Sequence, residues 1–123
     1  MRDVDLSVVT YRPDFALLSQ LFESLAEAAG AEVRLALLVQ DNSPEPDVAA
    51  RISTLPACKG GDFERVDVRF SGENLGFGRG HNANAARGSF PWILVINQDC
   101  IVEPGALRRL VETAAADDPR VAA

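Results

Sequence analysis

The sequence predicts an α/β fold built on a mostly parallel sheet of about four strands, with helices on both faces. Strand-like apolar runs alternate with helix-like patterns along all 123 residues, as they do in βαβ units. Polar residues follow several of these runs directly, at the positions where parallel sheets bind their ligands. A hydrophobic fraction of 47% is enough for a real core, so a single domain over residues 1–123 is expected.

The first part of the chain supplies two strands and a helix between them. Residues 6–10 form the first predicted strand. Asp14 then opens a helix whose apolar residues recur at spacings of three and four, and Gly30 stands where a C-terminal cap belongs. Residues 33–39 are apolar on both faces except for one arginine, which is typical of a central strand covered by helices on each side.

The middle of the chain is less regular. A weak helix over 47–55 is followed by a loop over 56–62. Residues 65–70 alternate strictly between apolar and polar, which predicts a strand at a sheet edge with one buried face. A glycine-rich turn over 72–80 then leads to a short helix over 82–87.

The last part predicts a buried strand over 92–96 and a final helix. Pro104 stands at the first position of that helix, and Pro119 stops it. Its apolar stripe consists of Leu107, Leu110, Val111 and Ala114.

Composition excludes several classes of protein. The chain has 12 basic and 18 acidic residues, a net charge of -6 and no basic cluster, so no nucleic-acid partner is expected. No apolar run approaches the roughly 18 residues of a membrane span, and the N-terminus lacks the pattern of a signal peptide, which predicts a cytoplasmic chain with no transmembrane segment. Cys58 and Cys100 lack the spacing of a metal or disulfide site, and His81 is expected to cap or pack against a helix start.

The tripeptide Asn97-Gln98-Asp99 places a carboxylate at the end of the predicted strand over 92–96. Such a carboxylate can hold Mg²⁺ or Mn²⁺ through oxygen while phosphates complete the octahedron. The alternative is a turn or helix-cap aspartate, which is common at strand ends. Because the chain is acidic, a diphosphate ligand would need an intervening cation, which favours the metal interpretation.

Polar residues after two other predicted strands would converge on the same edge of a parallel sheet. Thr10, Tyr11 and Arg12 follow the first strand, and Asp41 follows the second. Asp41 can accept a hydrogen bond from the imide N–H of a nucleobase, and Tyr11 can lie against a base or ribose. Arg12 can pair with a phosphate or a carboxylate. The alternatives are a turn role for Asp41 and ordinary exposed loop positions for Tyr11 and Arg12.

Residues 76–80 read Gly-Phe-Gly-Arg-Gly, which lets the backbone approach a ligand closely at a helix start. The segment is not a dinucleotide-binding fingerprint, because that motif follows the first strand directly. A P-loop is excluded as well, since GxxxxGK followed by Ser or Thr does not occur.

Four stretches carry a resemblance to a known family: 8–13 (VVTYRP), 39–43 (VQDNS), 73–82 (ENLGFGRGHN), and 94–99 (LVINQD) running into 102–107 (VEPGAL). On these stretches the chain resembles the N-terminal, nucleotide-sugar-binding portion of a family 2 glycosyltransferase with the GT-A fold, in its rhamnosyltransferase-like branch. The resemblance spans nearly the whole chain. It implies a Rossmann-like GT-A nucleotide-binding half.

The resemblance also implies which residues bind the nucleotide sugar: Thr10, Tyr11, Arg12, Asp41, Asn74, Gly78, Arg79 and Asn97. Within this set Asp41 would recognise uracil or thymine, while Asp99 would coordinate Mg²⁺ or Mn²⁺ on the diphosphate. The family often has Asn in place of Arg12 and Pro in place of Gln98, and its more general motif has an acid in place of Asn97. With one acid in the tripeptide, a metal would depend mostly on Asp99, water and phosphate oxygens.

The implied activity is inverting transfer of a sugar from a UDP- or dTDP-linked donor, with rhamnose among the candidates, to an unidentified hydroxyl acceptor in cell-wall or polysaccharide biosynthesis. Such enzymes continue into an acceptor-binding half that supplies an Asp or Glu as general base, and no acid of this sequence matches that base. We therefore expect residues 1–123 to be a truncated donor-binding domain, without a catalytic base, that works in the cytoplasm or at the inner face of the membrane. Its open sheet edge would favour self-association.

Two other functions are compatible with the sequence. One is a non-catalytic nucleotide-sugar-binding or interaction domain that keeps the donor site without transferring sugar. The other is a nucleotidyltransferase, which would need a glycine-rich basic loop after the first strand. That place is taken by Tyr11-Arg12-Pro13, which argues against the second function.

Overall fold

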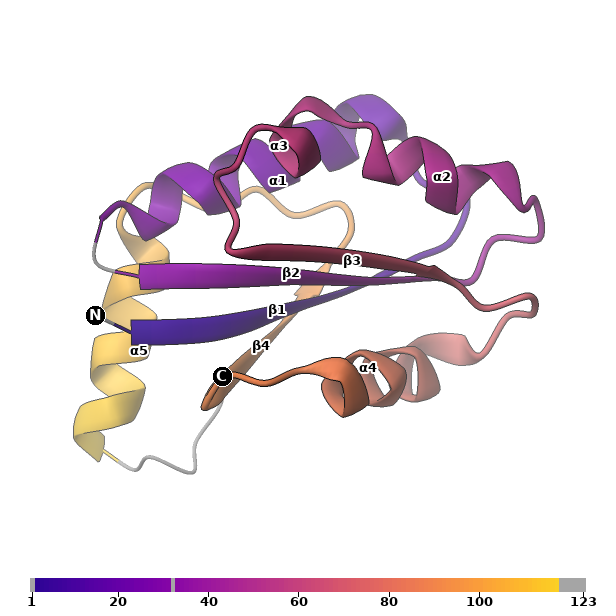
Figure 1. Ribbon diagram of the computed structural model, residues 1–123. Helices are drawn as coiled ribbons and strands as arrows, with labels where there is room; N and C mark the ends of the chain where they lie inside the picture. The colour runs from indigo at the N-terminus through magenta and orange to yellow at the C-terminus, as the bar shows by residue number, and fades with distance from the viewer. Residues whose placement is uncertain (1, 32, 118–123) are drawn as a thin grey trace.

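The computed structural model describes residues 2–31 and 33–117 and contains one four-stranded sheet in the order β3-β2-β1-β4 (Figure 1). Each neighbouring pair of these strands is parallel. The strands are β1 (Arg2–Thr10), β2 (Val33–Asp41), β3 (Arg65–Phe70) and β4 (Trp92–Asn97). The predicted α/β class and parallel sheet are therefore confirmed.

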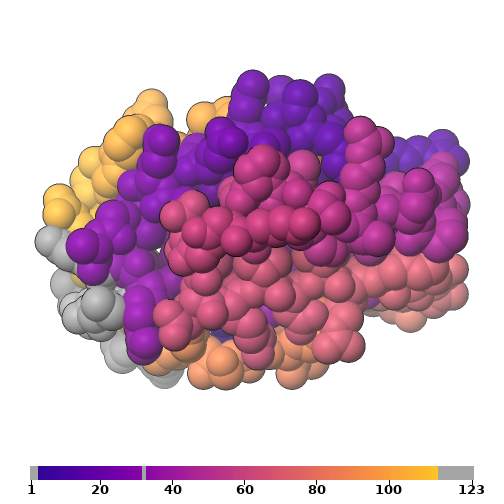
Figure 2. All heavy atoms as spheres, turned by 45° about the horizontal axis from the view of Figure 1, so that its top comes forward, coloured from indigo at the N-terminus to yellow at the C-terminus, as the bar shows by residue number. Residues whose placement is uncertain are grey.

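Helices cover both faces of the sheet, as expected. The helices are α1 (Phe15–Ala29), α2 (Asp47–Ser53), α3 (Pro56–Lys59), α4 (Gly76–Arg87) and α5 (Ala106–Asp117). The first three lie over one face, α4 lies over the other against β1 and β2, and α5 packs against α1 (Figure 1). In the space-filling view the segments of α1 to α3, coloured indigo to magenta, lie side by side over their face (Figure 2).

Helix α1 follows the predicted pattern closely. The carboxylate of Asp14 caps it by accepting from the backbone N–H groups of Ala16 and Leu17 at 3.0 and 3.2 Å. Gly30 ends it with a φ of 59°, in the left-handed region that glycine tolerates. Its apolar stripe is buried completely at Leu18, Leu21, Phe22 and Leu25. Each of these side chains contributes about 1.5–3 kcal/mol by leaving water, so this helix anchors one face of the core.

The two edges of the sheet differ from each other. β2 is central and β3 forms an edge, as predicted, and both β1 and β2 are longer than the apolar runs that identified them. The prediction that 92–96 is a fully buried strand is wrong, because in the described part of the chain β4 pairs only with β1, and Val95 is 43% exposed. Charged side chains on an edge strand discourage pairing with another chain, and β3 carries them whereas β4 carries none. Self-association through an open edge therefore stays a prediction, and β4 is the edge to which it applies.

Several helix boundaries differ from the predictions, and α2 ends at Ser53 rather than at 55. The loop over 56–62 contains the short helix α3, which begins with a proline at its first position. Helix α5 begins at Ala106 rather than at Pro104, because Gly105 has a φ of 78°. Of its predicted stripe, Leu107 and Val111 are buried while Leu110 is 38% exposed. The predicted stop at Pro119 lies outside the described residues, and side-chain burial is not described at Ala114.

The largest boundary error concerns α4, which begins at Gly76 rather than at 82. Glycine is a poor helix former, so three glycines in five residues read as a turn. The structure gives one of them a packing reason, because a Cβ at Gly80 would lie 2.7 Å from Cγ2 of Val9 on β1. Glycine therefore lets α4 lie directly on the sheet.

Gly80→Ala is expected to destabilise the protein by about 1–3 kcal/mol, the usual cost of overpacking a core. Gly78→Ala is the matched control in the same helix, because an added Cβ there meets nothing within 4 Å. The control should be neutral or stabilising by up to about 1 kcal/mol, since alanine is the better helix former. Urea unfolding of both variants measures the difference, and equal stabilities would show that the contact with Val9 is relieved at no cost.

Candidate active site

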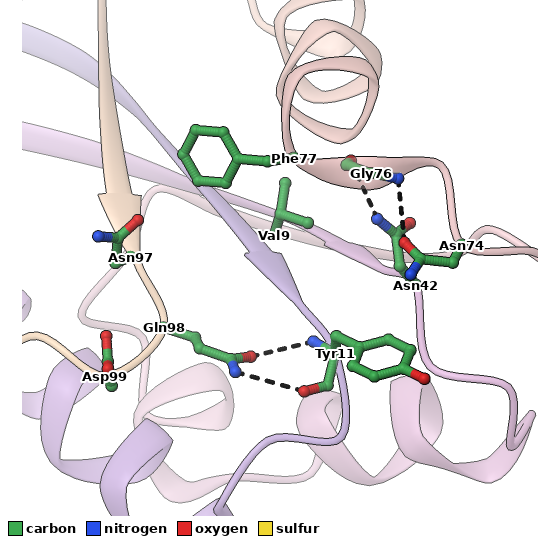
Figure 3. Close-up of a pocket in the computed structure, with 9 residues that line it drawn as sticks. All are labelled: Val9, Tyr11, Asn42, Asn74, Gly76, Phe77, Asn97, Gln98 and Asp99. Atoms are coloured by element: carbon green, nitrogen blue, oxygen red, sulfur yellow. Dashed lines mark hydrogen bonds between the residues drawn. The ribbon is translucent and has the colours of Figure 1, made fainter.

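A pocket of about 270 Å³ opens at the carboxyl ends of β1 and β4, beside the start of α4 (Figure 3). Its lining comes from three strand ends and from the segment that begins α4: Val9, Tyr11, Asn42, Asn74, Gly76, Phe77, Asn97, Gln98 and Asp99. The carboxyl edge of a parallel sheet is where α/β proteins bind ligands, so the pocket stands at the expected place.

The structure brings together only part of the predicted set. Tyr11, Asn74, Asn97 and Asp99 line the pocket. The other predicted residues lie outside the lining: Thr10, Arg12, Asp41, Gly78 and Arg79. Gly76 and Phe77 belong to the glycine-rich segment that was expected to approach a ligand. No binding role was predicted for Val9, Asn42 or Gln98, because apolar and amide side chains at strand ends carry little chemical signal.

Asp41 is the last residue of β2 and is completely buried beside the pocket residue Asn42. Its Oδ1 accepts from Oγ of Ser43 at 2.7 Å, from the backbone N–H of Ser43 at 3.2 Å and from Oγ1 of Thr10 at 2.9 Å. Its Oδ2 is buried with no hydrogen-bond partner. A buried acceptor without a partner is costly.

The two predicted arginines point to solvent. The side chain of Arg12 is 61% exposed, lies 3.5 Å from a carboxylate oxygen of Glu45, and has its guanidinium 5.5 Å from the centre of the Tyr11 ring. The side chain of Arg79 is 72% exposed and lies 3.9 Å from Glu73. Exposed pairs of this kind contribute little to stability. Both arginines stay free to turn toward an anion at small cost.

Gln98 joins the ends of β4 and β1. Its Oε1 accepts from the backbone N–H of Tyr11 at 3.0 Å, and its Nε2 donates to the carbonyl of Tyr11 at 3.3 Å (Figure 3). This two-bond contact fixes the backbone of Tyr11 against the segment that carries Asp99. A proline, which the family often has at position 98, has no side-chain amide for either bond.

Among the described residues that line the pocket, Asp99 supplies the one carboxylate, and it is exposed. Among the described residues, no group of three or more His, Cys, Asp or Glu side chains could hold a metal. Asp99 and Asn97 both line the pocket, and their carboxylate and amide oxygens are hard ligands of the kind that Mg²⁺ and Mn²⁺ prefer. Such a set fits a cation that arrives with phosphate oxygens and water rather than one bound by protein alone.

His81 has a packing role, as expected. It is 8% exposed, its Nδ1 lies 2.6 Å from Oγ of Ser7 on β1, and its ring meets Phe77 edge-on at a centroid distance of 4.3 Å. Burial lowers the pKa of His81 below its usual value, so the ring is neutral at pH 7. His81 is a residue of α4 and joins the first turn of this helix, through Phe77, to β1, through Ser7.

A second hollow of about 610 Å³ adjoins the pocket and shares Phe77 and Asn97 with it. Its other lining residues are mostly apolar and come from the end of β4 and the segment after it: Val95, Ile96, Cys100, Ile101, Val102, Glu103 and Ala106. The polar pocket therefore continues into an apolar surface.

The fold is a Rossmann-like α/β fold with a pocket at the carboxyl edge of its parallel sheet. The profile described as Glycosyl transferase family 2 matches residues 6–123, and the chain belongs to that family. The family resemblance is thereby confirmed, while the rhamnosyltransferase-like branch remains a prediction. Comparison with curated proteins gave no match.

Solved structures support the GT-A-like fold. A crystal structure of S. aureus TarS is similar with a TM-score of 0.73 and 16% identity, over 94% of this chain and 20% of that one. A crystal structure of S. aureus TarS 1-349 gives a TM-score of 0.74 and 17% identity, over 94% of this chain and 33% of that one. The chain thus spans between a fifth and a third of these proteins. In its described part, no helix is long and apolar enough to cross a membrane.

Proposed function

We propose that residues 1–123 are the donor-binding domain of an inverting glycosyltransferase that uses a UDP- or dTDP-linked sugar. The observation that carries this proposal is the convergence of Tyr11, Asn97 and Asp99 in one pocket at the carboxyl edge of the sheet. Membership of glycosyl transferase family 2 supports a sugar-transfer activity for the whole protein. The buried, unpartnered Oδ2 of Asp41 supports a pyrimidine base with an imide N–H, because that base would supply the missing donor.

The proposed chemistry divides between this domain and the acceptor side. Asp99 and the amide oxygen of Asn97 would hold Mg²⁺ or Mn²⁺, which neutralises charge on the departing diphosphate. Asn74 would border the nucleoside, and the two exposed arginines, Arg12 and Arg79, would turn toward the diphosphate. Among the described residues that line the pocket, Asp99 is the one acid, and we propose that the general base comes from outside residues 1–123.

Two of the predicted residues take indirect roles in this proposal. Thr10 donates to Asp41 rather than lining the pocket, so it would set the orientation of the base-recognising carboxylate. Gly78 has no side chain, and an added Cβ would project into open space. In this proposal its absence leaves room for the diphosphate beside α4. We further propose rhamnose as the sugar, cell-wall or polysaccharide synthesis as the pathway, and a location in the cytoplasm or at the inner face of the membrane.

A non-catalytic donor-binding or interaction domain is the second candidate. The observation that favours it is the absence, among the described pocket residues, of an acid other than Asp99 that could act as a base. Sugar transfer by the full-length protein distinguishes the two candidates. Donor binding without transfer to any hydroxyl acceptor would favour the binding domain.

Asp99→Ala is expected to abolish the Mn²⁺-dependent part of nucleotide binding, because it removes the one carboxylate of the proposed cation site. Calorimetric titration with UDP and dTDP, with and without Mn²⁺, measures this.

Thermal-shift screening of the wild type with UDP, dTDP, GDP and ADP identifies the preferred base, since a ligand at 100 times its Kd stabilises the native state by about 2.7 kcal/mol.

Asp62→Ala, in the exposed loop before β3, is the control for removal of a surface acid and should titrate like wild type. Unchanged Mn²⁺-dependent binding by Asp99→Ala would remove Asp99 from the cation site. A wild-type protein stabilised by purine but not pyrimidine nucleotides would contradict the role given to Asp41.

A further inference from the structure

A chain of partly buried hydrogen bonds runs along α4 from its last residue to its first. Arg87 Nη2 donates to Oε1 of Gln40 at 3.3 Å, and Gln40 Nε2 donates to Oγ of Ser71 at 2.6 Å. Ser71 Oγ donates to Oδ1 of Asn42 at 2.6 Å, and Asn42 Nδ2 donates to the carbonyl of Gly76 at 3.3 Å. We call this series of side chains the Arg87 chain. It connects the end of α4 with the pocket, where Asn42 and Gly76 are lining residues.

Arg87 sets the direction of every hydrogen bond in the Arg87 chain. A guanidinium only donates, so Gln40 must turn its amide oxygen toward Arg87 and its Nε2 toward Ser71. Ser71 then accepts from Gln40 and has its single hydroxyl hydrogen left for Asn42. Asn42 must in turn direct its Nδ2 to Gly76. The orientation of the Asn42 amide is therefore fixed by a cation at the far end of α4.

Asn42 contacts the start of α4 from the residue that follows β2. Leu75 stands at the N-cap position and makes no side-chain capping hydrogen bond. Gly76 has a φ of 79° and is held from two sides, by Oδ1 of Asn74 at its N–H and by Asn42 at its carbonyl (Figure 3). Asn42 is 2% exposed, and its own N–H donates to the carbonyl of Thr10 at 2.8 Å, so it is a firm support.

We propose that Asn42 is a positioning residue for nucleotide binding, which holds the Gly76 end of α4 in place because the Arg87 chain orients its amide. The inference rests on the proposed function, since it assigns Asn42 a role in the same pocket. Asn42 holds the carbonyl of Gly76, and through it fixes the position of the pocket wall formed by Asn74, Gly76 and Phe77.

Asn42→Asp tests the last bond of the Arg87 chain. The carboxylate keeps an acceptor for Ser71 but has no hydrogen for the Gly76 carbonyl. We expect UDP and dTDP to bind at least about tenfold more weakly than to wild type. Asn82→Asp, at an exposed position of α4, introduces the same change and the same charge outside the pocket and should bind within about twofold of wild type.

Gln40→Glu separates positioning from stability. A glutamate at this position accepts from Arg87 in a charge-assisted bond but cannot donate to Ser71, whose hydroxyl then has two acceptors to choose between. We expect a melting temperature close to that of wild type together with several-fold weaker nucleotide binding. Ser71→Ala, which removes the central hydroxyl with little change in volume, should weaken binding by a similar factor and provides the second test if Gln40→Glu folds poorly.

Amide hydrogen exchange without nucleotide gives a readout that does not require the proposed function. Asn42→Asp, Gln40→Glu and Ser71→Ala should each accelerate exchange within 74–80 while leaving exchange in β1 and β2 unchanged, and Asn82→Asp should not accelerate it. Exchange within 74–80 that stays at the wild-type rate in all three variants overturns the positioning role. A wild-type protein that binds no nucleoside diphosphate overturns the proposed function instead, and the exchange result still decides whether Asn42 fixes this segment.

Discussion

Asp41→Asn is expected to shift the base preference of the pocket from uridine and thymidine nucleotides to cytidine nucleotides. Oδ1 of Asp41 already accepts from Thr10 and from two donors of Ser43, so the amide oxygen of an asparagine must occupy that side. Its NH₂ group then takes the place of the unpartnered Oδ2. That group repels the imide N–H of uracil but donates to the unprotonated ring nitrogen of cytosine.

The expected size of this shift follows from the charge of the acceptor. A hydrogen bond to a charged group contributes about 1.5–3 kcal/mol, so UDP should bind about 10- to 150-fold more weakly while CDP gains affinity. Calorimetric titration of both nucleotides against wild type, Asp41→Asn and the exposed control Asp62→Asn measures the CDP-to-UDP ratio. An unchanged ratio in Asp41→Asn would mean that Asp41 does not face the base.

Arg87→Met should cause the largest loss of stability among single substitutions at the charged side chains described above. The Arg87 side chain is 17% exposed and lies 3.0 Å from Oδ1 of Asp67. It also donates to the carbonyl of Val39 at 3.2 Å, to Gln40 and to Oδ1 of Asn84. Methionine fills the volume but removes the donor to these acceptors, and Asp67 keeps only its bond from Arg69. Because Arg87 and Asp67 are partly buried, we expect a loss near the lower end of the about 3–5 kcal/mol that breaking a buried pair from one side costs.

Arg69→Met is the matched control, because Arg69 pairs with the same aspartate at 2.8 Å but its side chain is 63% exposed. Removing the Arg69 guanidinium should lower the free energy of unfolding by less than about 1 kcal/mol.

Burial raises the pKa of Asp67, but the hydrogen bond from Arg69 and the charges of Arg87 and Arg69 outweigh it and hold that pKa below its usual value. Such a carboxylate stabilises the fold above about pH 4 and loses this contribution as the pH falls through its folded pKa. Urea unfolding at pH 7 therefore compares the two variants fairly, and equal losses would contradict the special role of Arg87.

The sequence predicted elements well where one side-chain pattern governs one element. The stripe of α1, the central position of β2 and the edge position of β3 all follow from periodicity and are confirmed. The failures arise where tertiary contacts decide. Gly80 weakens a helix locally yet is needed against Val9, and the apolar residues of β4 read as buried although one side of that strand has no partner in the described part of the chain.

The candidate site was predicted in part for the same reason. Tyr11, Asn97 and Asp99 could be placed in the pocket because the carboxyl ends of parallel strands converge. Asn42 and Gln98 could not be assigned roles, because their importance depends on which backbone groups their amides meet across the fold. A departure from the family pattern at Gln98 was the one available signal for its contact with Tyr11.

The parallel order of the strands has a consequence for how the molecule acquires its site. Each strand pairing spans at least one intervening helix, and the pairing of β1 with β4 joins Val4 to Trp92 across most of the chain. Contacts between segments so distant in sequence form slowly, because the chain loses the entropy of closing a long loop before the favourable contacts between the strands are made. Since Tyr11 and Gln98 meet only when these two strands have paired, refolding kinetics should show helical signals well before the pocket can hold a ligand.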